Sequence, residues 1–291
     1  MLRSSRPASG PRAAPLIALL LLTILLAALL AYEAVGVVRS HQATAERAVR
    51  EYASLSAWEF LANAKASVRT TLGDALAPVT ESKASSPFEP LPPPALLAAS
   101  AGRVLRCEQP AEDGGRVYFR VALEDRALAT SGAQPSARLR SWLVDSIAVH
   151  ATRAFQPDAR FAVLFGTGAL SDRAVLYGVK YAQYGAPLAA YGLVTCASAF
   201  GAPLFGSLMR SYVLPPSAAR AGATVDSLLW LGASEASGRE LFRSSPDVPA
   251  TSGIESVEEI GGLRVRAALR PAAVSALIAG AEPPSRLPLL L

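Results

Sequence analysis

Residues 16–31, with the sequence LIALLLLTILLAALLA, decide how the chain is organised, because Thr23 is their only polar side chain. A bilayer core of roughly 30 Å requires about 20 predominantly apolar helical residues, and the apolar character continues here to Val38. We therefore predict one transmembrane helix over residues 15–38.

Basic residues set the expected topology. Arg3, Arg6 and Arg12 precede the span, and no acidic residue lies among them. The positive-inside rule therefore places residues 1–14 in the cytoplasm and the chain after the span outside it. A cleaved signal peptide also has a basic start and an apolar centre, and it is the alternative interpretation. The span is favoured because the apolar run is longer than a usual signal-peptide core.

Residues 39–77 predict a stalk helix that continues the span. This polar, helix-favouring stretch has apolar or amphipathic residues three or four positions apart. They are Ala45, Val49, Tyr52, Leu55, Trp58 or Glu59, Ala62, Ala66, Val68, Leu72 and Leu76. Pro78 and the proline-rich residues 78–100 are expected to end the helix and to form an extended linker.

The remaining sequence predicts an α+β fold in two units, residues 101–198 and a smaller unit at 199–280. Alternating and periodic patterns in the first unit predict two strands, a helix and three strands, at 102–107, 116–123, 136–155, 160–165, 174–181 and 188–196. The second unit is predicted to contain a loop with a short helix at 199–213, strands at 225–232, 239–243 and 262–269, and a short helix at 271–279. The apolar ending at 281–291 predicts the start of a second transmembrane helix, and an ordinary apolar tail is the alternative.

Composition and motifs exclude several classes of function. The net charge of the 291 residues is +5, and three of these positive charges precede the span, so the charge does not argue for nucleic-acid binding. The chain has no GxSxG, SxxK, HExxH, Walker A or GxGxxG motif. Its two histidines, His41 and His150, have no partner at metal-ligand spacing. We therefore expect no catalytic residue, metal or cofactor.

Cys107 and Cys196 are the only cysteines. The predicted topology places both in an oxidising compartment if the cell is Gram-negative, where disulfides persist. Two cysteines far apart in sequence fix no geometry, so a disulfide and two buried free thiols are both open interpretations.

Polar and aromatic residues on the predicted strands suggest a ligand wall between the first sheet and the helix at 136–155. Tyr177 and Tyr181 share one strand face, while Lys180 lies on the other face. Tyr118 and Arg120 share a face of an earlier strand. We expect these five residues to line a pocket, in which Arg120 or Lys180 would favour an anionic ligand. The alternative is that the tyrosines are ordinary packing residues of the sheet.

The order of these elements resembles the extracytoplasmic input region of bacterial transmembrane sensor histidine kinases, with a PAS-like, double Cache type of sensor. The resemblance covers most of the chain, and its motifs are diffuse. It is carried by the long preceding helix, the ββαβββ order and the sequences AERAVREYASLSAWEF (45–60), ASEASGRELFRSSP (233–246), GGLRVRAALRPAAVSALIAG (261–280) and SRLPLLL (285–291).

The resemblance implies a function in two-component signal transduction at the bacterial inner membrane, with the globular part in the periplasm. It also implies a small-molecule or protein ligand and a homodimer packed along the stalks. Ala45, Val49, Tyr52 and Leu55 are the candidates for that seam, or they pack on the globular part of the same chain. The phosphoacceptor box of such kinases begins His-Glu, whereas His41 precedes Gln42 and His150 precedes Ala151. The kinase half is therefore expected beyond Leu291.

Two other interpretations come from different functional classes. The first is a single-span anchored periplasmic binding or interaction protein, with no kinase in the same chain. The second is an anchored envelope enzyme of unrecognised type.

Overall fold

The computed structural model describes residues 13–83, 86, 88–107, 116–153, 159–183, 185–211, 224–247 and 255–270. The predicted helix at 271–279 and the predicted second span at 281–291 lie outside these residues. The predicted seam residues lie within a helix, but their side chains are outside the description. The chain divides into two compact units, residues 1–51 and residues 52–291.

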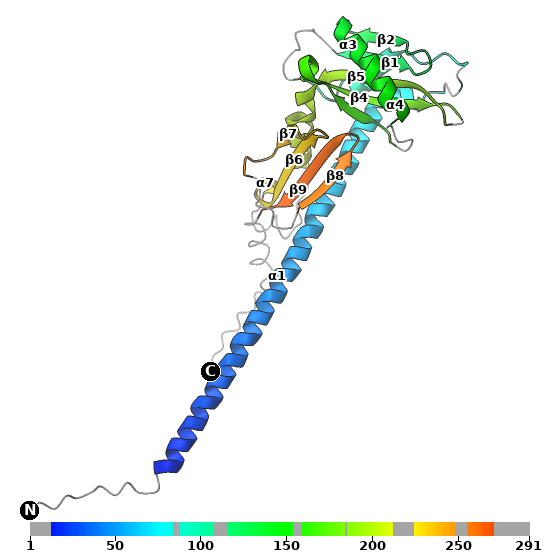
Figure 1. The fold of residues 1–291 in the computed structure, drawn as a ribbon. Helices are drawn as coiled ribbons and strands as arrows, with labels where there is room; N and C mark the ends of the chain where they lie inside the picture. Colours follow the sequence, from blue (N-terminus) through cyan, green and yellow to red (C-terminus); the bar gives the residue numbers. More distant parts are fainter. Residues whose placement is uncertain are drawn as a thin grey trace, which may run out of the picture. The chain divides into compact units, whose positions relative to one another are not determined.

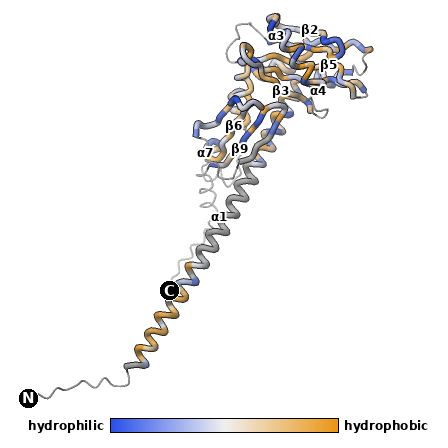
Figure 2. The backbone as a smooth tube through the Cα atoms, viewed as in Figure 1, coloured by the Kyte–Doolittle hydropathy of each residue, from blue (hydrophilic) through white to orange (hydrophobic). Residues whose placement is uncertain are grey.

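Helix α1 (Ala13–Thr80) is continuous over 68 residues and belongs to both units. Within the first unit, residues Pro15–Glu33 have a mean hydropathy of 2.6, and none of this window is buried. Figure 2 shows it as the orange run at the start of the helix. By length and composition it can cross a membrane, although a signal sequence meets the same criteria. One apolar helix is therefore confirmed, and the periplasmic location of the other residues stays a prediction.

Within the second unit, α1 buries one continuous face. The buried residues recur three or four positions apart, as one side of a helix requires. They are Phe60, Leu61, Ala64, Val68, Leu72, Ala75, Leu76 and Val79. The predicted periodicity is correct from Val68 onward but wrong between Trp58 and Ala66, because Trp58 is 55% exposed and Ala66 is exposed, while Phe60 and Leu61 are in the core.

Pro78 does not end α1, contrary to the sequence prediction, since the helix continues to Thr80. A proline in a helix removes one backbone hydrogen bond and crowds the preceding turn. Here this cost falls in the last turn, where Leu76 and Val79 are fully buried. Burial of each such side chain stabilises the fold by about 1.5–3 kcal/mol, which is enough to offset one lost bond.

The first sheet has five antiparallel strands in the order β2-β1-β5-β4-β3. Figure 1 shows them in green next to α3 and α4. The strands are β1 (Val117–Ala122), β2 (Leu128–Gly132), β3 (Ala162–Phe165), β4 (Arg173–Tyr181) and β5 (Pro187–Cys196). Central strands β4 and β5 pair from Arg173 opposite Cys196 to Tyr181 opposite Pro187, and their side chains are buried almost throughout. Edge strand β3 pairs only with β4.

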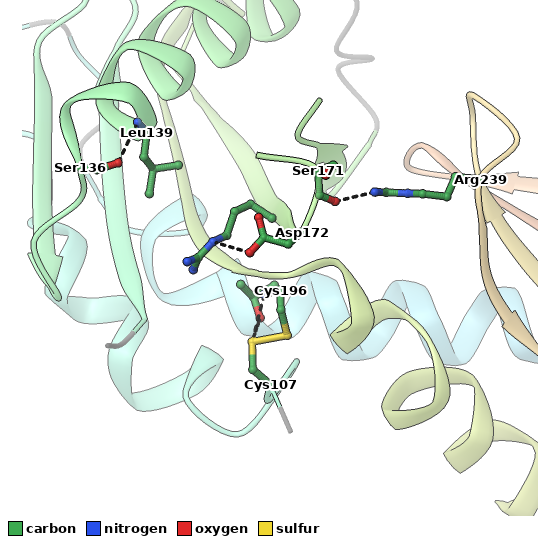
Figure 3. Close-up of polar contacts among 9 residues, drawn as sticks. Cys107, Ser136, Leu139, Ser171, Asp172, Cys196 and Arg239 are labelled. Atoms are coloured by element: carbon green, nitrogen blue, oxygen red, sulfur yellow. Dashed lines mark hydrogen bonds and ion pairs between the residues drawn. A yellow bond between two sulfur atoms is a disulfide. The ribbon is translucent and has the colours of Figure 1, made fainter. Parts of the chain in front are cut away.

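Helices cover both faces of this sheet. Residues such as Leu176, Leu193 and Val163 share a core with α1. Val175, Phe119 and Val194 point to the opposite core, which contains α3 (Ala137–Trp142), the π-helical turn η2 (Leu143–Ile147) and α4 (Ala148–Arg153). Ser136 caps α3, because its Oγ accepts a hydrogen bond of 3.3 Å from the backbone N–H of Leu139 (Figure 3).

The second sheet has four antiparallel strands in the order β7-β6-β9-β8. They are β6 (Leu229–Glu235), β7 (Glu240–Arg243), β8 (Glu255–Ile260) and β9 (Leu263–Leu269), and one-turn helix α7 (Val225–Leu228) precedes β6. Short helical segments η4 (Ala197–Phe200), η5 (Ala202–Gly206) and α5 (Ser207–Ser211) follow β5. Leu231 and Val265 join the core that α1 shares with the first sheet. The buried face of α1 therefore packs with residues from both sheets.

Several predicted boundaries are wrong. The strand predicted at 102–107 is absent, because the chain leaves η1 (Pro94–Leu96) and α2 (Leu97–Ala101) through turns, and Leu105 has a positive φ of 54°. The true partner of β1 is β2, which the sequence analysis missed together with β8. The strand predicted from residue 225 begins at Leu229, because Thr224 and Ser227 form a capping box that starts a helical turn. The α+β class is confirmed, and the remaining predicted strands are present.

Cys107 and Cys196 form a disulfide with a Cα–Cα distance of 5.8 Å. Figure 3 shows it as the yellow bond. It joins the segment that follows α2 to the end of β5. The Thr195 hydroxyl donates a hydrogen bond of 2.9 Å to the carbonyl of Leu105, which fixes the same junction. Of the two open interpretations of the cysteines, the structure therefore has the disulfide.

The apolar start of α1 leads to a prediction about membrane attachment. The full chain should remain in the membrane pellet after carbonate extraction, because the apolar segment would span the bilayer. Intact-mass measurement of the extracted protein should find residues 1–38 still attached. A soluble protein whose first residue lies after position 31 would instead identify a cleaved signal peptide.

Candidate functional site

The five predicted ligand residues do not form one wall. Tyr177 and Tyr181 lie on the sheet face that packs against α3 and α4. Tyr118 belongs to the core on the α1 side, and Arg120 and Lys180 make their hydrogen bonds on that side too. The residues lie on the strand faces that side-chain alternation predicts. The two faces of the sheet, however, belong to different cores.

Most of the space between the first sheet and the helices α3 to α4 is filled by side chains. A cavity of about 390 Å³ remains at its edge, lined by Leu128, Thr130, Arg140, Ser141, Val144 and Asp145. Phe119, Leu143, Ile147 and Val175 are all completely buried between the sheet and these helices. Tyr177 is also completely buried, and its hydroxyl is hydrogen-bonded to Nδ1 of His150 on α4. Burial raises the pKa of Tyr177 above its ordinary value and lowers the pKa of His150 below 6.5. Tyr177 is therefore a packing residue. None of the five predicted ligand residues lines the cavity at the edge of this interface, and their role in ligand binding stays a prediction.

Lys180 has a different role from the predicted one, since it caps the C-terminus of α1. Its side chain is almost completely buried, at 3% exposure. The ammonium donates hydrogen bonds of 2.6 Å to the carbonyl of Ser82 and 3.0 Å to the Ser82 hydroxyl, and it lies 3.5 Å from the carbonyl of Val79. Burial lowers its pKa, and Glu89 partly opposes that effect. The last turn of α1 has no basic residue of its own, so β4 supplies the positive charge that favours a helix C-terminus.

Arg120 holds the segment that follows α1. Its guanidinium donates hydrogen bonds to the carbonyls of Leu91, at 3.1 Å, and Pro92, at 3.5 Å. The hydroxyl of Tyr191 donates to the same Pro92 carbonyl at 3.0 Å, and burial raises the pKa of Tyr191 to about 12. Both predicted cations on the α1 side, Arg120 and Lys180, therefore bind backbone carbonyls of this chain.

A larger cavity, with a volume of about 980 Å³, lies elsewhere. It is an open cleft between α1, edge strand β3 and the two turns β6–β7 and β8–β9. We call it the β3 cleft. It is lined by Ala62, Lys65, Ala66, Arg69, Thr70, His150, Ala159, Arg160, Phe161, Ala162, Val163, Leu164, Phe165, Thr167, Glu235, Ala236, Ser237, Glu259, Ile260, Gly261 and Gly262. All these residues belong to the second unit, and none of the five predicted ligand residues is among them.

The β8–β9 turn closes one side of the β3 cleft because two glycines allow it to approach β3. Gly261 and Gly262 have φ values of 57° and 94°, a region that favours glycine. The carbonyl of Gly261 accepts a hydrogen bond of 2.7 Å from the N–H of Val163. A Cβ added at Gly262 would lie only 2.5 Å from the carbonyl oxygen of Val163. The turn therefore covers part of the open edge of β3.

The β6–β7 turn lies beside the β8–β9 turn, because Glu235 pairs with Leu263, and it is held to the first sheet by Arg239. This residue forms an ion pair of 3.1 Å with Glu235, and its guanidinium lies 5.4 Å from the centre of the Phe165 ring. It also donates a hydrogen bond to the carbonyl of Ser171, which Figure 3 shows between the two sheets. Glu235 also accepts a bond of 2.5 Å from Ser237, so its carboxylate is satisfied by groups of its own turn.

No protein-family model and no curated protein matches the chain. Its function must therefore be argued from its own geometry. Among the residues that the structure describes, no three His, Cys, Asp or Glu side chains are grouped so that they could hold a metal ion. The β3 cleft combines an apolar floor with a few charged groups, which is a common lining of ligand sites.

The sequence carried two signals of the β3 cleft that the sequence analysis did not use. Lys65 and Arg69 are four residues apart on a helix, which places two positive charges on one face. The Gly-Gly pair 261–262 also marks a turn where another backbone approaches closely. Neither signal tells which strand lies opposite, so tertiary structure was required to combine them.

The α1 cap leads to a prediction about stability. Replacing Lys180 with Met should lower the free energy of unfolding by about 1–3 kcal/mol, because the Ser82 carbonyl loses its charged donor. The measurement is thermal unfolding of the detergent-solubilised full chain. Lys83→Met is the matched control, because Lys83 is exposed on the same segment. Equal stability of the two variants would contradict the capping role.

The lowered pKa of His150 leads to a prediction about pH. The folded state disfavours the protonated imidazole, so the unfolded chain binds the additional proton as the pH falls through 6.5 and below. Acidification from about pH 7.5 to about pH 5.5 should therefore destabilise the wild type more than His150→Gln, whose amide can still accept from Tyr177. Melting temperatures at both pH values measure this difference. Parallel loss of stability in both proteins would show that His150 does not contribute.

Proposed function

We propose that this chain is the extracytoplasmic sensing region of a transmembrane sensor histidine kinase, and that α1 transmits the signal. One observation carries the proposal: a single continuous helix contains the apolar segment Pro15–Glu33 and also forms a wall of the β3 cleft with Lys65 and Arg69. A ligand in the cleft therefore contacts the same helix that would enter the membrane.

The proposed transmission mechanism depends on the contacts that fix the position of α1. Its face from Phe60 to Val79 packs with side chains of both sheets, and Lys180 binds its C-terminal end. A ligand shifts a conformational equilibrium only if it binds the two states with different affinity. Contacts in the β3 cleft provide that difference, because they join α1 to β3 and to the two turns. Displacement of the helix along its axis is the expected output.

The order of elements around the first sheet supports a PAS-like assignment. A long helix precedes two strands, a helical segment and three strands, which together form one antiparallel sheet. The ββαβββ order on which the resemblance rests is thus present, although its two first strands are β1 and β2 rather than the predicted pair. The second, smaller sheet fits the double Cache type. Pairing of two chains along residues 45–55 is part of this proposal.

A second candidate function is an anchored binding protein at the cell surface or in the periplasm. The β3 cleft supports a binding protein as strongly as it supports a sensor, because both require a ligand site. A binding protein requires no transmission through α1. The reading frame of the source DNA beyond Leu291 discriminates the two. A sensor kinase requires a second apolar span, a helix with His-Glu and then Asn- and Gly-rich boxes, whereas an immediate stop codon leaves the binding protein.

Insertion of Gly-Pro after Ala57 tests the transmission through α1. In the full-length receptor this insertion breaks the helix between the membrane and the β3 cleft, so ligand-dependent autophosphorylation should be lost. A Gly-Pro insertion after Asp125, in the exposed turn between β1 and β2, is the control and should leave it intact. Signalling that survives the first insertion at wild-type level would refute the proposed role of α1.

A further inference from the structure

The floor of the β3 cleft is apolar, whereas one wall is basic. Residues Phe161 to Phe165 of the β3 segment contribute only apolar side chains, and Ala62, Ala66 and Ile260 add to them. The basic wall consists of Lys65 and Arg69 on α1 and Arg160 before β3, which together we call the basic row. A ligand that satisfies both surfaces needs an apolar body and a negatively charged group.

The basic row follows the axis of α1. Lys65 and Arg69 are separated by four residues, a rise of about 6 Å. One turn further on, Gly73 has no side chain, and Arg160 lies over this position, since a Cβ added to Gly73 would be 3.2 Å from Cδ of Arg160. Three cations therefore occupy successive turns of the same wall. Like charges at i and i+4 destabilise a helix slightly, so an anion between them would stabilise the arrangement.

Two cations of the basic row, Arg69 and Arg160, are weakly compensated by the protein. Arg69 is exposed and has no ion pair or hydrogen bond in the described part of the chain. Arg160 lies 3.9 Å from Asp74, but both side chains are about two-thirds exposed, at 66% and 64%, so this pair contributes little. Of the two carboxylates of the cleft, Glu235 is mostly buried and paired with Arg239, whereas Glu259 is 72% exposed, so its pair with Arg264 contributes little. The lining of the β3 cleft has three cations and two carboxylates, and its excess charge is therefore positive.

The open edge of β3 does not favour an added peptide strand. The hydrogen bond from Val163 to Gly261 already uses the centre of this edge, and Gly262 lies against the Val163 carbonyl. A strand would have to displace the β8–β9 turn to pair with β3. A volume of about 980 Å³ is instead at the upper end of the range for a small-molecule site.

We propose that the β3 cleft binds a small organic anion with an apolar body, whose carboxylate or phosphate is held by Lys65, Arg69 and Arg160. This ligand class applies to the β3 cleft whether or not the chain is a sensor. Only the consequence for signalling rests on the proposed sensor function. Because two of the three cations belong to α1, the anionic group would draw this helix toward β3. Neutralising the basic row would have the same effect on α1 as ligand removal.

The test uses two probes that differ in charge. The carboxylate 2-naphthoate and the uncharged 2-naphthamide are titrated calorimetrically into the full chain in nanodiscs, with empty nanodiscs as the blank. We expect the carboxylate to bind more tightly than the amide. Arg69→Gln should weaken carboxylate binding about tenfold, because a hydrogen bond to a charged group is lost. Arg138→Gln, on the exposed surface of α3, should leave it unchanged.

The outcomes separate the ligand class from the signalling role. Equal affinity for both probes, or no effect of Arg69→Gln on a variant with wild-type melting temperature, would overturn the anion site. Absence of any saturable carboxylate binding up to millimolar concentration would overturn it too. Carboxylate binding that depends on Arg69 but leaves autophosphorylation of the receptor unchanged would retain the site and reject the sensor function.

Discussion

Burial of one face of α1 is the constraint on which the second unit depends. Seven apolar residues from Phe60 to Val79 are buried in one core that they share with side chains of both sheets. Strand β4 approaches closely at Gly178, where an added Cβ would lie 3.2 Å from a methyl group of Leu76 and 3.1 Å from Thr80. The two sheets therefore have a common packing partner, and a shift of α1 would disturb both.

Polar contacts at the end of α1 make its position specific. Apolar burial alone is non-directional and tolerates small displacements along a helix axis. Lys180 adds a fixed reference point, because its buried ammonium must keep its oxygen partners or remain unsatisfied. Ser100 contributes a second one through a bond of 2.9 Å to the carbonyl of Ala75. The arrangement suits a helix with a small number of defined positions, which is what a transmitting element requires.

The elements with strong periodicity could be predicted from the sequence. Elements and sites whose position depends on tertiary contacts could not. The apolar run at 16–31, the central strands β4 and β5 and the helix after Ser136 were predictable because their patterns are long. Strand β2 was missed because LATSG has no clear alternation and all its residues are partly exposed. Lys180, Arg120 and Tyr177 look like pocket residues in sequence, whereas in the structure they make hydrogen bonds to the segment after α1 and to α4. The β3 cleft joins residues from five separate parts of the chain, which no local pattern can reveal.

Hydrogen–deuterium exchange of the full chain in nanodiscs tests most directly whether α1 and the sheets form one structural unit. The account predicts that backbone amides of residues 68–79 in α1 are as strongly protected as those of the central strands β4 and β5, because all of them open only with the shared core. Exchange of the α1 amides that is much faster than that of β4 and β5 would show that the helix detaches independently, and it would contradict the account.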